Sequence, residues 1–490
     1  MAFRLTLTVT VTITVAVLVA APRLDAAPLA TKPCDLPGVE GARCATFEVF
    51  ENRRLGKGRR IGLNVVVLPA VAAKPAPDAV FWLHGGPGAP ATEVAGAGTQ
   101  GFLKELHQDH DLVFVDQRGT GKSHPLQCDI GDDPTHLDVF FGPLFPPELV
   151  RRCRAALEKD ADLTMYTTPI AMDDLDDVRA ALGYAKIDLV AASYGTIAAQ
   201  VYLRQHGDHV RAAFLLGVAT PGVKQPLLFP RGAQHAMDLL YEDCAADDVC
   251  GKAFPRLKEE LAAVLARFDA GPLRVNLVEV NGGKPRSVLL TRDNFVERLR
   301  LLLYTTTFAR FVPLVIHRAF ENDFLPFESI AVNYNPGGGL ARGMYFTVTC
   351  SEGVPFISDE ELRREAAGTF VGEGRIVAHR NACKEWPRGA VPPGYIDPVR
   401  SDVPVLLFSG ELDGSTPPWF GKSALQSLPN GVQITARYYG HQFDAPCSVE
   451  TMDALIAKGS AKAVDGSCAA AIRRPPFATE LPPQLSLGRS

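Results

Sequence analysis

The sequence predicts an α/β fold in which a mainly parallel sheet is flanked by helices and a mostly helical cap is inserted between two strands. Three observations carry this prediction. Short apolar runs that end at glycine-rich turns predict buried strands, helical periodicity between them predicts covering helices, and this alternation stops after residue 220 and resumes at residue 404. The predicted strands are 61–68, 79–83, 112–115, 187–191, 212–216, 404–408 and 432–438.

Each predicted helix carries apolar residues at three- and four-residue spacing. In the first half of the chain, helices 173–182 and 196–204 alternate with strands, which is typical of a parallel sheet. The interruption is largely helical and has a glycine-rich break at 335–339. Its clearest predicted helices are 233–244, 257–268 and 291–303.

Strands return after the interruption, so we interpret the inserted stretch as a cap and not as a separate terminal domain. The predicted organisation is a signal peptide (1–30), the first part of the sheet domain (31–220), the cap (221–399) and the C-terminal part of the sheet domain (400–490). A chain of 490 residues is long enough to bury a large core in this arrangement.

Composition places the chain among ordinary globular proteins. It is 47% hydrophobic and 21% charged, with a formal net charge of -5 and a pI near 6.2. Because no basic stripe stands out, a nucleic-acid partner is not expected. The sequence leaves the oligomeric state open.

The N-terminus has the pattern of a signal peptide. Arg4 is followed by a run of Leu, Val, Thr and Ala without charge until Arg23. A membrane anchor is the alternative, but the run is Thr-rich, short for a span and ended by Pro22. We expect cleavage between Ala20 and Ala30, giving a secreted or periplasmic protein without a stable membrane anchor.

Ten cysteines form an even set without a C-x-x-C pair, which suits an oxidising compartment better than a zinc site. Sequence alone does not fix their connectivity, and free buried thiols remain the alternative. Neighbours in the sequence favour the pairs Cys34–Cys44, Cys128–Cys153, Cys244–Cys250, Cys350–Cys383 and Cys447–Cys468.

A candidate nucleophile lies in the motif VAASYG at 190–195, between a predicted strand and a predicted helix. Such a tight turn lifts a serine hydroxyl above the sheet, and it needs small residues two positions before and after the serine. Here these are Ala191 and Gly195, around Ser193. Alanine is larger than the usual glycine, and this kind of motif occurs often by chance, so the surrounding motifs must decide.

The motif FWLHGGPG at 81–88 opens a predicted strand into a glycine-rich loop, N-terminal to the serine turn. Acyl transfer needs backbone N–H groups aimed at the developing oxyanion, and glycine lets the chain approach the substrate closely. Gly86, with Gly85 as the alternative, and Tyr194 are the predicted donors. A simple turn is the other interpretation of this loop.

An acid and a base should follow the serine in that order. Asp413 follows a predicted strand and precedes the turn GSTPP, and His441 follows a second predicted strand. We therefore predict Asp413 as the residue that orients the base and His441 as the base. Glu411 and Asp444 are the rival acids.

Other motifs carry less weight. GAGTQG at 96–101 reads as a flexible loop, GKS at 121–123 lacks the first glycine of a phosphate-binding loop, and His107 and His110 read as surface residues. His84 reads as a structural contact beside the glycine-rich loop. No metal and no organic cofactor are predicted.

The motifs HGGPG (84–88), DQRGTGKS (116–123), SYG (193–195) and GELD (410–413) together resemble the prolyl aminopeptidase and tripeptidyl aminopeptidase group of α/β hydrolases. The resemblance covers the sheet domain well and the cap thinly. Cys447 and Cys468 after the histidine are similar to the secreted tripeptidyl aminopeptidase branch. The sequence departs from the family pattern at Ala191, at 414–415 and at Gln442.

The resemblance implies a serine exopeptidase that cleaves near a free peptide N-terminus through an acyl-enzyme. It also implies that an acidic cap residue binds the substrate amine, and TCSE at 349–352 makes Glu352 the candidate. A surface glutamate beside a disulfide is the alternative. Arg118 is expected to brace loops near the site.

Two other functions stay open. The same triad would serve a secreted esterase, lactonase or amidase acting on a small ester or amide, and a non-catalytic binding protein could retain the fold. Serine at the turn argues against the epoxide hydrolases and haloalkane dehalogenases, which use aspartate there.

Overall fold

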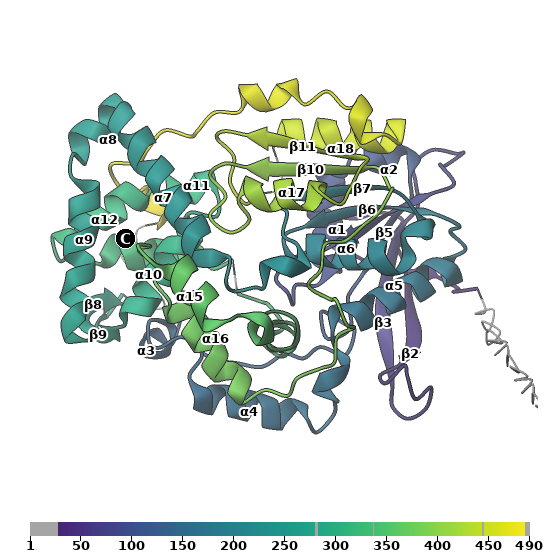
Figure 1. The fold of residues 1–490 in the computed structure, drawn as a ribbon, viewed down its shortest axis with the longest axis horizontal. Helices are drawn as coiled ribbons and strands as arrows, with labels where there is room; N and C mark the ends of the chain where they lie inside the picture. Colours follow the sequence, from purple (N-terminus) through teal and green to yellow (C-terminus); the bar gives the residue numbers. More distant parts are fainter. Residues whose placement is uncertain (1–27, 280–282, 337, 443–444, 486–490) are drawn as a thin grey trace, which may run out of the picture.

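The computed structural model describes residues 28–279, 283–336, 338–442 and 445–485 (Figure 1). Its centre is a nine-stranded sheet with the order β1-β2-β3-β5-β4-β6-β7-β10-β11. Five neighbouring pairs, from β5–β4 through β10–β11, are parallel, whereas the three pairs that involve β1, β2 and β3 are antiparallel. The predicted α/β fold with a mainly parallel sheet is confirmed.

The parallel strands are short and apolar because both faces of the sheet are covered. Every residue of β4 (Ala79–Leu83), β5 (Leu112–Val115), β6 (Ile187–Ala192) and β10 (Val405–Gly410) is buried. The other strands are β1 (Lys32–Pro33), β2 (Arg43–Phe50), β3 (Arg60–Leu68), β7 (Val210–Leu216) and β11 (Gly431–Ala436).

Alternate residues along each strand point into two different cores, as the two-residue period of a strand requires. Phe81 and Leu83 pack with helices α5 (Thr168–Leu182), α6 (Tyr194–His206) and α17 (Pro418–Leu425) on one face. Val80 and Trp82 pack on the opposite face with α1 (Val94–Gln100), α2 (Leu106–Asp109) and α18 (Pro446–Lys458).

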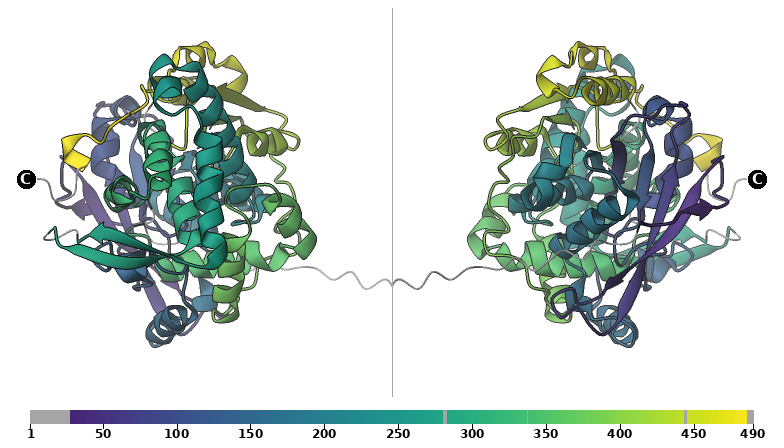
Figure 2. Two further views of the ribbon diagram at one scale, coloured as in Figure 1. Left: turned by 90° about the vertical axis from the view of Figure 1, so that its left-hand side faces the viewer. Right: turned by 90° about the vertical axis from the view of Figure 1, so that its right-hand side faces the viewer.

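Between β7 and β10 the chain forms an insertion that is mainly helical and has a core of its own. In Figure 1 its helices lie to the left of the sheet, and Figure 2, left, looks onto them. The insertion comprises α7 (Phe229–Ala246), α8 (Asp248–Ala253), α9 (Leu257–Arg267), the hairpin β8 (Leu273–Val278) and β9 (Pro285–Leu290), α10 (Arg292–Leu302), α11 (Thr306–Ala309), α12 (Val312–Phe320), α13 (Leu325–Asn333), α14 (Arg342–Val348), α15 (Asp359–Ala366) and α16 (Gly374–Lys384).

Two segments from outside 221–399 also pack into the core of the insertion. Phe140 and Phe141, in and just after α3 (Leu137–Phe140), join it, as do Phe477 and Ala478 near the C-terminus. Helix α4 (Pro147–Leu157) lies under α14 and α16. The predicted division into a sheet domain in two parts, 31–220 and 400–490, and an inserted cap, 221–399, stays a prediction.

All ten cysteines are paired, with S–S distances of 1.92 to 2.07 Å. The bonds join Cys34–Cys44, Cys128–Cys153, Cys244–Cys250, Cys350–Cys383 and Cys447–Cys468, which are the pairs favoured by their neighbourhood in the sequence.

The predicted signal peptide 1–30 lies almost entirely outside the described residues, and so does the rival acid Asp444. Within the described ranges no single helix has the length and hydropathy to cross a membrane. The segment Arg292–Leu302 meets those criteria only together with Thr306–Phe320, from which it is bent by 117°.

Candidate active site

Ser193 occupies the sharp turn between β6 and α6, at the carboxyl edge of the sheet. Its backbone has φ 57° and ψ -127°, a conformation that costs a non-glycine residue strain and that is concentrated at functional sites. Gly195 is required because a Cβ there would lie 2.2 Å from the carbonyl oxygen of Leu83. Ala191, the departure from the usual glycine, is fully buried in the core of the sheet.

The predicted acid and base meet at the same edge of the sheet. Asp413 follows β10 and His441 follows β11, and His441 Nδ1 lies 2.8 Å from Asp413 Oδ2. Parallel strands bring their carboxyl ends together, so these loops also lie beside the turn that carries Ser193. Both side chains are buried.

Asp413 is held by donors from the turn that follows it. The backbone N–H groups of Ser415 and Thr416 donate to Oδ1 at 2.8 and 2.7 Å, and Thr416 Oγ1 donates to Oδ2 at 2.6 Å. Burial favours the neutral acid, but the charge of His441 and these hydrogen bonds outweigh it, so the pKa of Asp413 lies below its ordinary value. The predicted rival Glu411 instead faces Arg437 at the half-exposed surface.

The loop of His441 is fastened to the insertion. The backbone N–H of His441 donates to the carbonyl oxygen of Tyr304, and the two rings lie 5.1 Å apart. Gln442 Oε1 accepts hydrogen bonds from Thr306 N and Oγ1, both at 3.1 Å. The glutamine that departs from the family pattern therefore connects the base loop to α11.

The glycine-rich loop lies directly against the serine. A Cβ on Gly85 would come within 2.9 Å of Ser193 Cβ, and both Gly85 and Gly86 line the same cavity as Ser193. Tyr194 is the first residue of α6, where backbone N–H groups have no partner within the helix. Which glycine pairs with Tyr194 as oxyanion donor stays a prediction.

A cavity of about 690 Å³ lies between the carboxyl edge of the sheet and the insertion. Ser193, His441, Gly85 and Gly86 line it from the sheet domain. From the insertion come polar and charged residues that the sequence analysis did not single out: Asn294, Glu297, Arg298, Arg300, Tyr304, Asn335, Arg342, Tyr345 and Arg375.

Glu352 does not line this cavity, contrary to what its predicted role as amine ligand requires. Its carboxylate is buried behind the serine turn, where it accepts hydrogen bonds from Thr168 N (2.6 Å), Thr168 Oγ1 (2.7 Å) and the Tyr395 hydroxyl (2.5 Å). Thr168 Oγ1 also lies 2.6 Å from the hydroxyl of Tyr194. Burial raises the pKa of Glu352 to about 7, although these hydrogen bonds favour the charged form. The position suits a group that supports Tyr194 from behind.

Arg118 connects segments near the site, whereas the structural role predicted for His84 stays a prediction. The guanidinium of Arg118 is fully buried, forms two hydrogen bonds with Asp174 and donates to the carbonyl oxygens of Glu51 and Met165. His84 lines the cavity near the glycine-rich loop, and burial lowers its pKa to about 4, so it is neutral at pH 7.

Two carboxylate–imidazole clusters among the described residues have a spacing that a metal ion could use, and both lie outside the cavity. One joins Asp176, His206 and His209, and the other joins Asp78, His110 and Asp188. Their carboxylates are already engaged in the chain, for example Asp176 by Arg179 at 2.7 Å. We assign no metal to either.

Comparison with known families agrees with this geometry. Residues 78–252 match the family described as alpha/beta hydrolase fold, and residues 369–468 match the family described as TAP-like protein. The chain is an α/β hydrolase with a TAP-like segment.

Three known proteins illustrate how distant the relatives of this α/β hydrolase are. Serine protease Hip1 of Mycobacterium tuberculosis (strain ATCC 25618 / H37Rv) is 28% identical over 254 residues, which cover 47% of this chain and 48% of that protein. Tripeptidyl aminopeptidase of Streptomyces lividans is 32% identical over 126 residues (23% and 22%), and proline iminopeptidase of Neisseria gonorrhoeae is 27% identical over 139 residues (28% and 32%). The hydrolase therefore spans half or less of the length of the relatives it matches.

Proposed function

We propose that this α/β hydrolase is an exported serine exopeptidase that cleaves peptide bonds near a free N-terminus. The observation that carries the hydrolytic part is the convergence of three elements on one cavity: the strained turn of Ser193, the glycine-rich loop and the 2.8 Å contact between His441 and Asp413. The names of the relatives support a peptidase.

In the proposed mechanism, Ser193 Oγ attacks the carbonyl carbon of the substrate while His441 Nε2 takes the hydroxyl proton. Asp413 holds Nδ1 of the ring and stabilises the imidazolium, and the N–H groups of Tyr194 and of Gly86 or Gly85 stabilise the oxyanion. His441 then protonates the leaving amine, which departs and leaves an acyl-enzyme. Water, deprotonated by His441, releases the acid and restores Ser193.

Hydrolysis of paired chromogenic peptides with free and acetylated N-termini, beside a simple acyl ester, tests this proposal. We expect turnover of the free peptides only, reduced by at least ~10³-fold in Ser193→Ala. Ser448→Ala is the matched control and should keep full activity, because Ser448 is a buried serine on α18 whose hydroxyl donates to the carbonyl oxygen of Ala445.

The outcomes separate the alternatives. Ester turnover without peptide cleavage would replace the peptidase by a capped esterase or amidase. No Ser193-dependent activity, together with no labelling by a fluorophosphonate probe, would favour a binding protein. In an active peptidase, Glu352→Gln should keep the preference for free over acetylated N-termini, because Glu352 lies outside the cavity.

Export is the second part of the proposal and has its own support. Five disulfides suit an oxidising compartment. N-terminal sequencing of the protein recovered outside the cytoplasm should find a first residue between Ala20 and Ala30. An intact Met1 would overturn cleavage of a signal peptide.

A further inference from the structure

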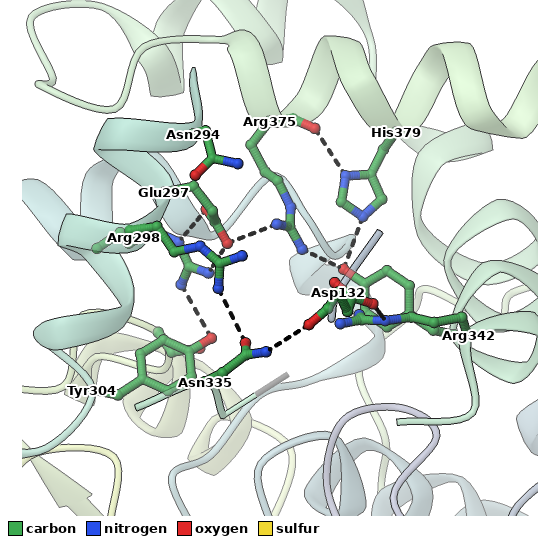
Figure 3. Close-up of polar contacts among 12 residues, drawn as sticks. Asp132, Asn294, Glu297, Arg298, Tyr304, Asn335, Arg342, Arg375 and His379 are labelled. Atoms are coloured by element: carbon green, nitrogen blue, oxygen red, sulfur yellow. Dashed lines mark hydrogen bonds and ion pairs between the residues drawn. The ribbon is translucent and has the colours of Figure 1, made fainter. Parts of the chain in front are cut away.

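The end of the cavity formed by the insertion is rich in arginine. Figure 3 shows Glu297 and Arg298 on α10 facing Arg375, with Arg342 and Asp132 nearby. Four guanidinium groups line this end of the cavity, from Arg298, Arg300, Arg342 and Arg375, against the carboxylates of Glu297 and Asp132. The excess of positive charge faces the space that a substrate would enter.

Both carboxylates, Glu297 and Asp132, already form ion pairs with arginines of the protein. Glu297 accepts from Arg300 Nη2 at 2.6 Å, Arg300 Nε at 2.8 Å and Arg375 Nη1 at 2.6 Å. Burial alone would raise the pKa of Glu297, but Arg300 and Arg375 lower it to about 2. Asp132 forms an ion pair with Arg342. Neither carboxylate is therefore a ready counter-charge for a substrate ammonium.

Of these four arginines, Arg298 is the one that forms no ion pair with a described residue. It is only 8% exposed, and its partners are uncharged: Asn335 Oδ1 at 3.1 Å and the carbonyl oxygen of Phe140 at 3.3 Å. The guanidinium also lies 3.7 Å from the centre of the Phe140 ring. Burial lowers its pKa to about 10, with a smaller contribution from Arg342 and Arg375, and the charges of Asp132 and Glu297 oppose this shift, so Arg298 stays charged at pH 7. A buried charge with neutral partners is costly, and a planar guanidinium binds carboxylates through paired hydrogen bonds.

We propose that Arg298 binds a carboxylate on the acyl part of the substrate, so that the hydrolase favours peptides with an acidic residue near the N-terminus. This inference rests on the proposed function for its substrate class. It adds a specificity-determining residue, on the wall of the cavity that holds Ser193.

The position of Arg298 along the chain limits where the carboxylate lies. Helix α10 ends at Leu302, about 6 Å beyond Arg298 at a rise of about 1.5 Å per residue, and Tyr304, whose ring contacts His441, follows two residues later. An extended peptide advances about 3.5 Å per residue. The carboxylate is therefore expected about two to three residue lengths from the attacked carbonyl carbon, on a side chain of one of the first residues.

Tripeptide p-nitroanilides with Glu or Gln at the first or second position, and alanine elsewhere, test this directly. At pH 7 the wild type should give a kcat/KM at least ~10-fold higher for one Glu substrate than for its Gln partner, as a hydrogen-bonded charge pair predicts. Arg298→Gln should remove that ratio, and Arg298→Lys should retain part of it. Arg363→Gln, which changes an exposed arginine on α15, should leave the ratio unchanged. Equal rates for Glu and Gln at both positions, or an unchanged ratio in Arg298→Gln, would overturn the proposal.

Binding measurements on an inactive variant test the anion site separately from catalysis. Calorimetric titration of Ser193→Ala with the free tripeptides Glu-Ala-Ala, Ala-Glu-Ala and their Gln counterparts should show tighter binding of one acidic peptide, lost when Arg298→Gln is added. That result together with no Ser193-dependent turnover would reject the proposed peptidase and keep the anion site. Equal affinities for all four peptides alongside normal turnover would reject the anion site and keep the peptidase. If Arg298→Gln fails to fold, Arg298→Lys and the wild-type ratios decide.

Discussion

At the scale of single residues, Thr416 contacts both the acid and the base of the site. Its backbone N–H and its hydroxyl both bond Asp413, and its Oγ1 lies 3.0 Å from His441 Nδ1. The hydroxyl thus helps to keep the carboxylate charged and aimed at the ring. The turn GSTPP after the acid, where the family pattern is not followed, supplies this group.

Thr416→Val removes the hydroxyl at nearly constant volume. A lost hydrogen bond to a charged group costs about 1.5–3 kcal/mol, so we expect kcat/KM to fall at least ~10-fold. Steady-state kinetics on the best peptide or ester measures this. Thr451→Val is the control, because Thr451 is equally buried but bonds carbonyl oxygens in α18. Full activity in Thr416→Val would mean that Asp413 is oriented without the hydroxyl.

Removal of the Glu297 carboxylate should destabilise the fold strongly. Glu297→Gln leaves Arg300 and Arg375 without their shared counter-charge, and breaking a buried pair costs about 3–5 kcal/mol of unfolding free energy. Glu365→Gln, which breaks partly exposed pairs with Arg231 and Arg364, should cost no more than about 1 kcal/mol. Denaturant unfolding at pH 7 compares the two.

The effect of Glu297→Gln should depend on pH. The folded pKa of about 2 lies below the ordinary value, so the carboxylate stabilises the fold fully above about pH 4.5 and loses this effect as the pH falls toward 2. The gap in stability between wild type and Glu297→Gln should therefore shrink between about pH 5 and pH 2. A gap that stays constant over this range would show that folding does not lower the pKa of Glu297.

At the scale of elements, the base loop after β11 depends on α11. Gln442→Ala removes an acceptor shared by Thr306 N and Oγ1, and hydrogen bonds of about 0.5–1.5 kcal/mol predict a 2- to 10-fold fall in kcat. Gln433→Ala is the control, because this glutamine bonds Ser409 and Pro418 within the sheet domain. An unchanged kcat in Gln442→Ala would show that the other contacts with Tyr304 are enough to place His441.

The elements also show why part of the site could be predicted from the sequence. Ser193, Asp413 and His441 each follow a strand whose apolar run is readable, and the order of parallel strands brings such loops together. Arg298 belongs to a predicted helix, but its surroundings come from Phe140 and Asn335, which are far from it in the sequence. No pattern of neighbouring residues in the sequence could reveal these contacts. A glutamate beside a cysteine likewise does not reveal which side of the serine turn it faces.

At the scale of the whole molecule, each disulfide should contribute to the free energy of unfolding according to the length of the loop that it closes. Cys350–Cys383 closes 33 residues and Cys244–Cys250 closes 6. Chain entropy predicts losses of about 3.7 and about 2.2 kcal/mol when both cysteines of each pair become serine. Denaturant unfolding of the two double variants should reproduce this order. The reverse order would indicate that the loop closed by Cys350–Cys383 is constrained by other contacts in the unfolded chain.

The cap was predicted as an insertion with boundaries at 221 and 399, but residues from outside these boundaries pack into its core. Phe140 and Phe141 come before the serine turn in the chain, and Phe477 comes after the base, yet all three pack in the core of the insertion. A boundary drawn from the return of strands has no access to such packing. The strand pattern located the insertion because buried parallel strands differ so clearly from amphipathic helices.

The hydrogen bond from His441 N to the carbonyl oxygen of Tyr304 has a consequence for recombination between relatives. The position of His441 depends on a main-chain atom of the insertion, which also supplies the four arginines that line the cavity. A chimaera that exchanged 221–399 for the equivalent stretch of another hydrolase would acquire a new substrate preference. It would also need a new acceptor for the backbone N–H of His441, in the place of the Tyr304 carbonyl oxygen. Selectivity and chemistry in this chain are therefore expected to evolve together, and not as exchangeable modules.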